Sequence, residues 1–238
     1  MGKEYDWRAA MKRVYVVVEG QAEQEFVRSV MAPFLAASGI LSVTPILIRT
    51  SDTGKGGFVS YEHLRQKTVM PLLASRMDDF IVTTLVDFFR IPHNLPEYEE
   101  CMCERDDACR VAALERAIDK DVHDPRFFSY IQLHEFEALL FADNAGFEYY
   151  FDSTESGKTA EIVSSFGTPE DINSTPEGAP SKRILAIKPD YNKVIEGNLI
   201  ALHVGIDSIM NRCPRFRAWI EKIVSRASLT FNSGRRLS

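Results

Sequence analysis

The chain has 238 residues, of which 45% are hydrophobic and 26% charged, which is enough apolar material for one large globular domain or a domain with an elaborated second half. It has no run of about 18 apolar residues and no apolar signal core, and its four cysteines are too few for a disulfide scaffold. A cytoplasmic protein without membrane spans is therefore expected. The net charge of −6 argues against nucleic-acid binding unless the charges are unevenly distributed.

Residues 1–11 are expected to form a flexible extension. The β-branched and aromatic run 14–18 predicts a strand buried on both faces, and helical periodicity follows from residue 22 to about 37. Glu19 ends the strand and Glu23 lies about one helical turn later, so both carboxylates could face one point. Two acids at a strand end suggest a divalent cation with oxygen ligands. The alternative is that they are solvated acids favoured by the helix dipole.

A second strand is expected at 42–48, where Pro45 favours a sheet edge. The following loop contains Gly54 and Lys55, but it lacks the glycine and the Ser or Thr that a phosphate-binding P-loop needs, so an NTPase is excluded. Lys55 could still contact a phosphate. A plain surface loop is the alternative.

A helix is predicted at 60–75 and a strand at 80–86 that ends on Asp87. If this strand is parallel and adjacent to 14–18, Glu19 and Asp87 emerge side by side at one sheet edge. That coincidence strengthens the metal hypothesis, although Asp also ends strands because it caps turns.

A helix at about 106–118 and a strand at 127–132 complete the predicted α/β core, residues 12–142. The nearby cysteines lack the paired spacing of a zinc site. The segment after the strand is helical in character, with His134 and Glu137 three residues apart and so on one face. Glu137 is a third candidate acid and His134 a candidate acid–base group. Glu137 could instead pair with Arg183.

Residues 143–226 are expected to be mostly helical and packed on the core, with a disordered tail at 227–238. Eleven Lys and Arg but only four acids follow position 181, whereas nine acids and four bases lie between 97 and 121. This asymmetry permits a phosphate-binding face on an acidic protein. Lys182, Arg183 and Lys193 are its candidate residues, the first two near the start of a short helix.

Four motifs together resemble the bacterial family of unknown function numbered 4276. They are Val-Glu-Gly-Gln-Ala-Glu-Gln-Glu-Phe at 18–26, Thr-Thr-Leu-Val-Asp-Phe-Phe at 83–89, Tyr-Ile-Gln-Leu-His-Glu-Phe-Glu-Ala-Leu-Leu-Phe at 130–141 and Ala-Pro-Ser-Lys-Arg-Ile at 179–184. That family looks like a TOPRIM domain, the α/β metal-binding fold of topoisomerases, primases and nucleases of the overcoming-lysogenisation-defect class. Related members are similar to components of phage-defence cassettes and often stand beside an ATPase.

The resemblance implies a TOPRIM-like, mainly parallel sheet flanked by helices, with Glu19, Glu23 and Asp87 matching metal-binding or catalytic acids. Phe89 stands where the second acid of the Asp-x-Asp pair belongs, which puts a two-metal mechanism in doubt. The expected function is a Mg²⁺- or Mn²⁺-dependent nuclease of a defence or mobile-element system. The alternative is a non-catalytic subunit that binds DNA or RNA and works with a partner ATPase. The sequence leaves self-association open.

Overall fold

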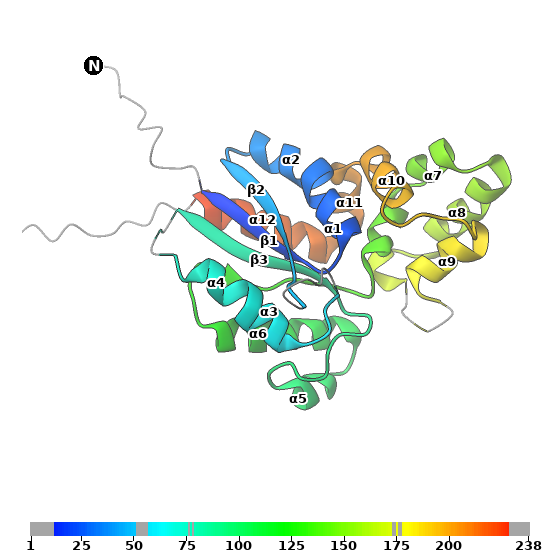
Figure 1. The fold of residues 1–238 in the computed structure, drawn as a ribbon. Coiled ribbons are helices and arrows are strands. Elements are labelled where there is room, and N and C mark those ends of the chain that lie inside the picture. Colours follow the sequence, from blue (N-terminus) through cyan, green and yellow to red (C-terminus); the bar gives the residue numbers. More distant parts are fainter. Residues whose placement is uncertain are drawn as a thin grey trace, which may run out of the picture.

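The computed structural model describes residues 12–50, 57–75, 77, 79–172, 175 and 178–228, and an all-parallel sheet of five strands lies at its centre (Figure 1). The strands are β1 (Arg13–Val18), β2 (Ser42–Leu47), β3 (Phe80–Asp87), β4 (Phe127–Phe128) and β5 (Ile131–Gln132). Their order is β2-β1-β3-β4. Strand β4 pairs with the middle of β3, and β5 pairs with the carboxyl end of β3. The predicted parallel sheet flanked by helices is confirmed. Pro45 lies on the edge strand β2, where a missing N–H is tolerated.

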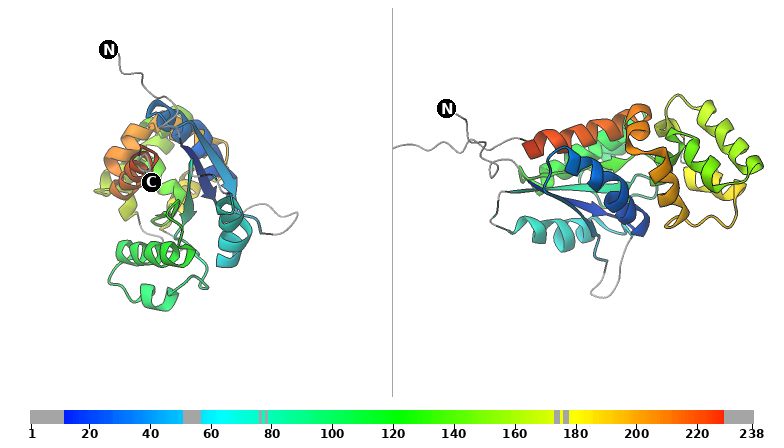
Figure 2. Two further views of the ribbon diagram at one scale, coloured as in Figure 1. Left: turned by 90° about the vertical axis from the view of Figure 1, so that its left-hand side faces the viewer. Right: turned by 90° about the horizontal axis from the view of Figure 1, so that it is seen from above.

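Helices cover both faces of the sheet, and accordingly residues 16–18 of the central strand β1 are all buried valines (Figure 2). One layer is α1 (Gln21–Phe26), η2 (Val27–Met31), α2 (Ala32–Ala37) and α12 (Pro214–Ser228); the other is α3 (Tyr61–Leu64), η3 (Arg65–Val69), α4 (Met70–Leu73) and α6 (Asp107–Val122). In β1, Val16 is buried under the first layer and Val17 under the second.

The helices predicted at 22–37 and 60–75 each contain a π-helical turn, η2 and η3, that ends two residues before a proline. The prolines are Pro33 and Pro71. Because proline has no N–H and its ring clashes with a carbonyl of the preceding turn, a wider turn is a way to pass it without breaking the helix. The helix predicted at 22–37 is thus one continuous helix that consists of α1, η2 and α2.

The remaining helices lie mainly beyond the carboxyl ends of the strands (Figure 1). They are α5 (Tyr98–Met102), η4 (Phe136–Ala142), α7 (Ala145–Tyr150), α8 (Ser153–Ser165), η5 (Pro169–Asp171), α9 (Pro180–Ile187), α10 (Glu196–Val204) and α11 (Ile206–Arg212). None of the helices described is long and apolar enough to cross a membrane.

The last helix, α12, returns to the sheet and belongs to the core that the first strands build. Trp219 donates from Nε1 to Thr83 Oγ1 of β3 at 2.9 Å and stacks on Tyr130 with 4.4 Å between ring centroids. Residues 143–226 were predicted to pack on the core, and α12 is a helix of that part that contacts β3. The helix also continues to Ser228, past the predicted start of the tail. The extension at 1–11 and residues 229–238 lie outside the described residues.

Helices α7 and α10 pack so closely that Gly146→Ala is expected to destabilise the protein by about 1–3 kcal/mol. A Cβ at position 146 would lie 2.6 Å from the carbonyl oxygen of Ile200 and 2.8 Å from its Cγ2. Urea unfolding would measure the effect. In the matched control, Gly157→Ala on the exposed side of α8, the new Cβ has nothing within 4 Å, so stability should rise by about 0.5–1 kcal/mol. Equal effects of the two substitutions would contradict this packing argument.

The chain changes the face of the sheet between β1 and β3. After β1 it forms α1 on one face, whereas the long helix after β3, α6, lies on the other. In open α/β sheets the crevice at the carboxyl ends of two such strands is where ligands bind. Glu19 and Asp87 stand at this crevice.

Candidate functional site

Glu19 and Asp87 are brought together by the register of β1 and β3. Val18 pairs with Leu85, so the two acids leave adjacent strand ends. Glu19 Oε2 accepts a hydrogen bond from the Asp87 backbone amide at 3.4 Å, and Gly57 N donates to the Glu19 carbonyl at 2.8 Å. Asp87 Oδ1 accepts from Phe136 N at 2.9 Å. Backbone amides therefore fix both carboxylates.

Glu23 enters the same pocket from the first turn of α1, and Gly20 makes room for it. Gly20 is extended, with φ −141°, so its role does not depend on a left-handed conformation. A Cβ at this position would lie 2.8 Å from Glu23 Oε2 and would push that carboxylate aside. Glu23 is only 3% exposed, which excludes the solvated first-turn acid considered from the sequence.

Glu137 lies deeper than the other acids, and its charge is opposed by Lys193. The Lys193 ammonium, on the segment between α9 and α10, lies 3.3 Å from Glu23 Oε1 and 3.3 Å from Glu137 Oε1. Glu137 is 0% exposed, and no donor among the described residues stands in hydrogen-bonding geometry to either of its oxygens. It is therefore buried beneath Lys193, and its partner is Lys193, not Arg183, which was the alternative considered from the sequence.

Burial dominates the electrostatics of the acids. It raises the pKa of Glu137 to about 7, against the opposing effect of Lys193. Burial likewise raises the pKa of Asp87, and it raises the pKa of Glu19 together with the charge of Glu23. For Lys193, burial alone lowers the pKa, but the attraction of Glu137, Asp87 and Glu23 raises it overall. The ammonium is thus held charged beside Asp87 and Glu137, whose ionisation burial disfavours.

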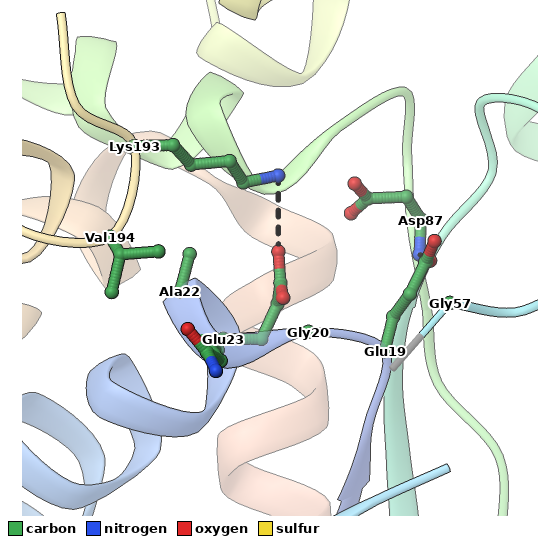
Figure 3. A pocket seen from close by; sticks show the side chains of 9 residues that line it. Glu19, Gly20, Ala22, Glu23, Gly57, Asp87, Lys193 and Val194 are labelled. Atoms are coloured by element: carbon green, nitrogen blue, oxygen red, sulfur yellow. Dashed lines mark hydrogen bonds and ion pairs between the residues drawn. The ribbon is translucent and has the colours of Figure 1, made fainter. Parts of the chain in front are cut away.

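A cavity of 220 Å³ opens between these groups and is lined by Glu19, Gly20, Gln21, Ala22, Glu23, Gly57, Asp87, Lys193 and Val194 (Figure 3). Its acidic donors are all oxygens, which suit Mg²⁺ or Mn²⁺. The two unbonded oxygens of Glu137 fit the same chemistry. As the side chains stand, the described residues hold no group of three or more ligating side chains able to share one ion. The donor set suits a metal, but Lys193 lies among the acids.

The structure does not bring His134 to this pocket. His134 precedes η4 in a left-handed conformation, with φ +69°, so it does not share a helical face with Glu137 as predicted. Burial lowers the pKa of its imidazole, against the opposing charges of Asp107 and Asp171. The proposed acid–base role of His134 has no geometric support from this arrangement.

The basic candidates also differ from expectation in their surroundings. Glu135 accepts hydrogen bonds from Ser181 N at 2.9 Å and Ser181 Oγ at 3.0 Å, so a carboxylate already occupies the start of α9. Arg183 donates from Nε to the Gly178 carbonyl at 2.7 Å. Lys182 is exposed. Its role in phosphate binding stays a prediction, and Lys55 lies outside the described residues.

Three contributors to the pocket were not predicted from the sequence. The Phe58 amide hydrogen-bonds to Glu19 and lowers its pKa, although burial outweighs it. Tyr191 is buried near Glu137, and its hydroxyl has no hydrogen-bond partner in the part of the chain that the structure describes. Asn198 donates to the Ala22 carbonyl at 3.1 Å, which ties α10 to the first turn of α1. Only Asn198, a polar residue in an apolar helix, could have drawn attention.

The family model described as Domain of unknown function (DUF4276) matches residues 18–224, which include all the acids of the pocket. The chain belongs to this family. The DUF4276 match thereby confirms the resemblance seen in the four motifs. No curated protein matches the sequence.

This DUF4276 chain is similar to two solved structures of OLD proteins. One is the C-terminal region of the Xanthomonas campestris pv. campestris OLD protein phased with platinum, with 15% identity, a TM-score of 0.46 and coverage of 91% of this chain and 94% of that one. The other is the C-terminal region of the Burkholderia pseudomallei OLD protein, with 15% identity, a TM-score of 0.44 and coverage of 90% and 99%.

Proposed function

We propose that this DUF4276 protein is a divalent-metal-dependent nuclease that hydrolyses phosphodiester bonds. The observation that carries the proposal is the convergence of Glu19, Glu23 and Asp87, with the buried Glu137 behind them, at the switch point of a parallel sheet. These residues would hold Mg²⁺ or Mn²⁺, which when bound activates water and stabilises charge on a scissile phosphate. The family resemblance supports a role in a bacterial defence or mobile-element system, with a partner ATPase.

In this proposal, the Lys193 ammonium is a positive charge that the protein itself supplies to the acid pocket. Four carboxylates in and behind one cavity repel one another, and an ammonium 3.3 Å from two of them offsets part of that repulsion. The charge of Lys193 also favours the approach of a phosphate. Its predicted role in phosphate binding is therefore compatible with its ion pairs to Glu23 and Glu137.

A non-catalytic nucleic-acid-binding or sensor subunit is the second candidate. Phe89 stands in place of an acid, and the described residues form no ready three-ligand site. Both observations favour a pocket in which Lys193 permanently neutralises the acids. Such a subunit would bind DNA or RNA, or dock on a partner ATPase, without cutting.

Purified protein incubated with plasmid DNA and with RNA should cut in Mg²⁺ or Mn²⁺ and not in chelator. Glu19→Gln and Asp87→Asn are expected to lower the rate by about 100-fold or more, because each removes a ligand charge. Glu221→Gln, on the exposed side of α12, is the matched control and should cut like wild type. Binding without cutting in any metal would favour the second candidate. A protein that neither cuts nor binds would refute both.

A further inference from the structure

A phosphodiester backbone that approaches the acid pocket needs cations beyond the one already there. Lys193 is engaged by Glu23 and Glu137, and Glu135 occupies the start of α9. Carboxylates repel phosphate unless positive charge surrounds them. The cations sought are therefore exposed, lack an acidic partner and stand at the carboxyl ends of the strands. Two arginines among the described residues meet all three conditions.

Arg49 is the first of these and follows β2. Val18 of β1 pairs with Leu47, and Ile48 N donates to the Val18 carbonyl at 3.0 Å, so the two chains continue side by side past the end of β2. This register places Arg49 level with Gly20, which lines the pocket. Its side chain is exposed and forms no ion pair with any other described residue.

Arg90 is the second and follows β3, three residues after Asp87. It is exposed, it has no carboxylate partner within the described part of the chain, and its guanidinium lies 5.1 Å from the centroid of the Phe89 ring. Its backbone is left-handed, with φ +60°, which is costly for any residue with a Cβ. Phe89 N donates to the His134 carbonyl at 2.8 Å and Ile91 N to the Phe88 carbonyl at 3.1 Å, so the turn is fixed on both sides.

We propose that Arg49 and Arg90 bind the phosphates of a polynucleotide strand that crosses the carboxyl ends of β2, β1 and β3, with the acid pocket between them. The proposal rests on the nuclease function, and it specifies the substrate as an internal stretch of a polynucleotide strand. Strands β2 and β3 flank β1, so their ends are about 10 Å apart. This distance lets the two arginines contact phosphates that are close to one another on the same strand. Phe89, in place of an acid, holds the Arg90 guanidinium by a cation–π contact.

The backbone of Arg90 allows a test that separates charge from structure. Glycine adopts positive φ without steric cost, so Arg90→Gly should fold at least as stably as wild type and lose only the guanidinium. A melting temperature that is unchanged or higher, together with weaker binding, is expected. A residue retained only for the stability of the turn would give the opposite result, a lower melting temperature with unchanged binding.

Binding would be measured with a fluorescein-labelled 20-nucleotide single-stranded DNA and the RNA of the same sequence, in Ca²⁺, between 50 and 200 mM salt. Arg49→Ala and Arg90→Gly should each weaken binding of both the DNA and the RNA roughly fivefold to tenfold near 100 mM salt. Each should also reduce the slope of log K against log salt concentration by about one, the value for one lost phosphate contact. Arg116→Ala on α6 and Arg217→Ala on α12, exposed arginines on the helices that cover the faces of the sheet, are matched controls and should bind like wild type.

A double Arg49→Ala/Arg90→Gly variant that binds like wild type, with the same salt dependence, would overturn this assignment while leaving the nuclease function intact. The assignment also fails if the control arginines weaken binding equally, because the effect would then be one of net charge. A wild-type protein that binds neither strand overturns it as well. The response of the melting temperature to Mn²⁺ then reports separately on the metal centre.

Discussion

Millimolar Mn²⁺ is expected to raise the melting temperature of the protein by about 5–10 °C. A ligand at about 100 times its dissociation constant adds about 2.7 kcal/mol to the free energy of unfolding, and 1 kcal/mol corresponds to about 2–4 °C in a chain of this size. The physical source is the crowding of Glu19, Glu23, Asp87 and Glu137 around one ammonium, which leaves negative charge for a cation to neutralise.

Differential scanning fluorimetry in chelator and in Mn²⁺ would measure this shift. Glu19→Gln and Asp87→Asn should remove most of it, whereas Glu221→Gln, exposed on α12, should retain it. A melting temperature indifferent to Mn²⁺ would mean that Lys193 satisfies the acids by itself and would argue against the metal centre. A shift that survives Glu19→Gln would place the ion elsewhere.

The main strands and the two strand-end acids could be predicted from the sequence because their signals are local. An uninterrupted β-branched run marks a strand buried on both faces, and β1 and β3 have such runs. An acid after each run, on strands that prove to be parallel neighbours, is enough to place Glu19 beside Asp87. Glu23 follows from helical spacing.

The rest of the site depends on contacts distant in the sequence, which local patterns do not encode. Lys193 comes from an irregular segment 56 positions after Glu137, and only the return of α10 beside α1 brings the two together. For His134, the local pattern predicted a proximity to Glu137 that the structure does not have. The pattern 134–141 reads as one helix, but a left-handed residue separates His134 from η4 and turns it away from Glu137. The helix α12 belongs to the part that was predicted to pack on the core, but periodicity does not reveal which face of the sheet it covers.

The occupied start of α9 could not be foreseen for the same reason. Lys182 and Arg183 near a helix N-terminus are a reasonable anion site in sequence terms. In the structure the Glu135 carboxylate already accepts from Ser181 N and Oγ. A capping partner 46 residues away is invisible to local rules, and it moves the search for phosphate-binding cations to Arg49 and Arg90.

Without metal, the protein is expected to become less stable as pH rises from 5 to 8. Burial raises the pKa of Glu137 to about 7, above the ordinary value of 4.5 that applies when the chain is unfolded. A group with a raised pKa contributes stability that is fully present below its unfolded pKa and is lost as pH rises through the folded one. The loss attributable to Glu137 is about 2 kcal/mol over this range. Glu19 and Asp87, whose pKa values burial also raises, act in the same direction.

His134 acts in the opposite direction, since burial lowers its pKa and the unfolded chain then binds the extra proton at mildly acidic pH. The informative quantity is therefore the difference between wild type and Glu137→Gln, in which the His134 contribution cancels. Urea unfolding in chelator at pH 5, 6, 7 and 8, at constant ionic strength, should show a flatter profile for the variant.

Saturating Mn²⁺ should abolish the difference in slope, because a cation favours the ionised carboxylate that burial disfavours. Identical profiles for wild type and Glu137→Gln in chelator would mean that Lys193, 3.3 Å away, keeps Glu137 ionised throughout this range. Glu137 would then be one half of a permanent buried ion pair. In that event Glu19, Glu23 and Asp87 alone would remain to bind a metal.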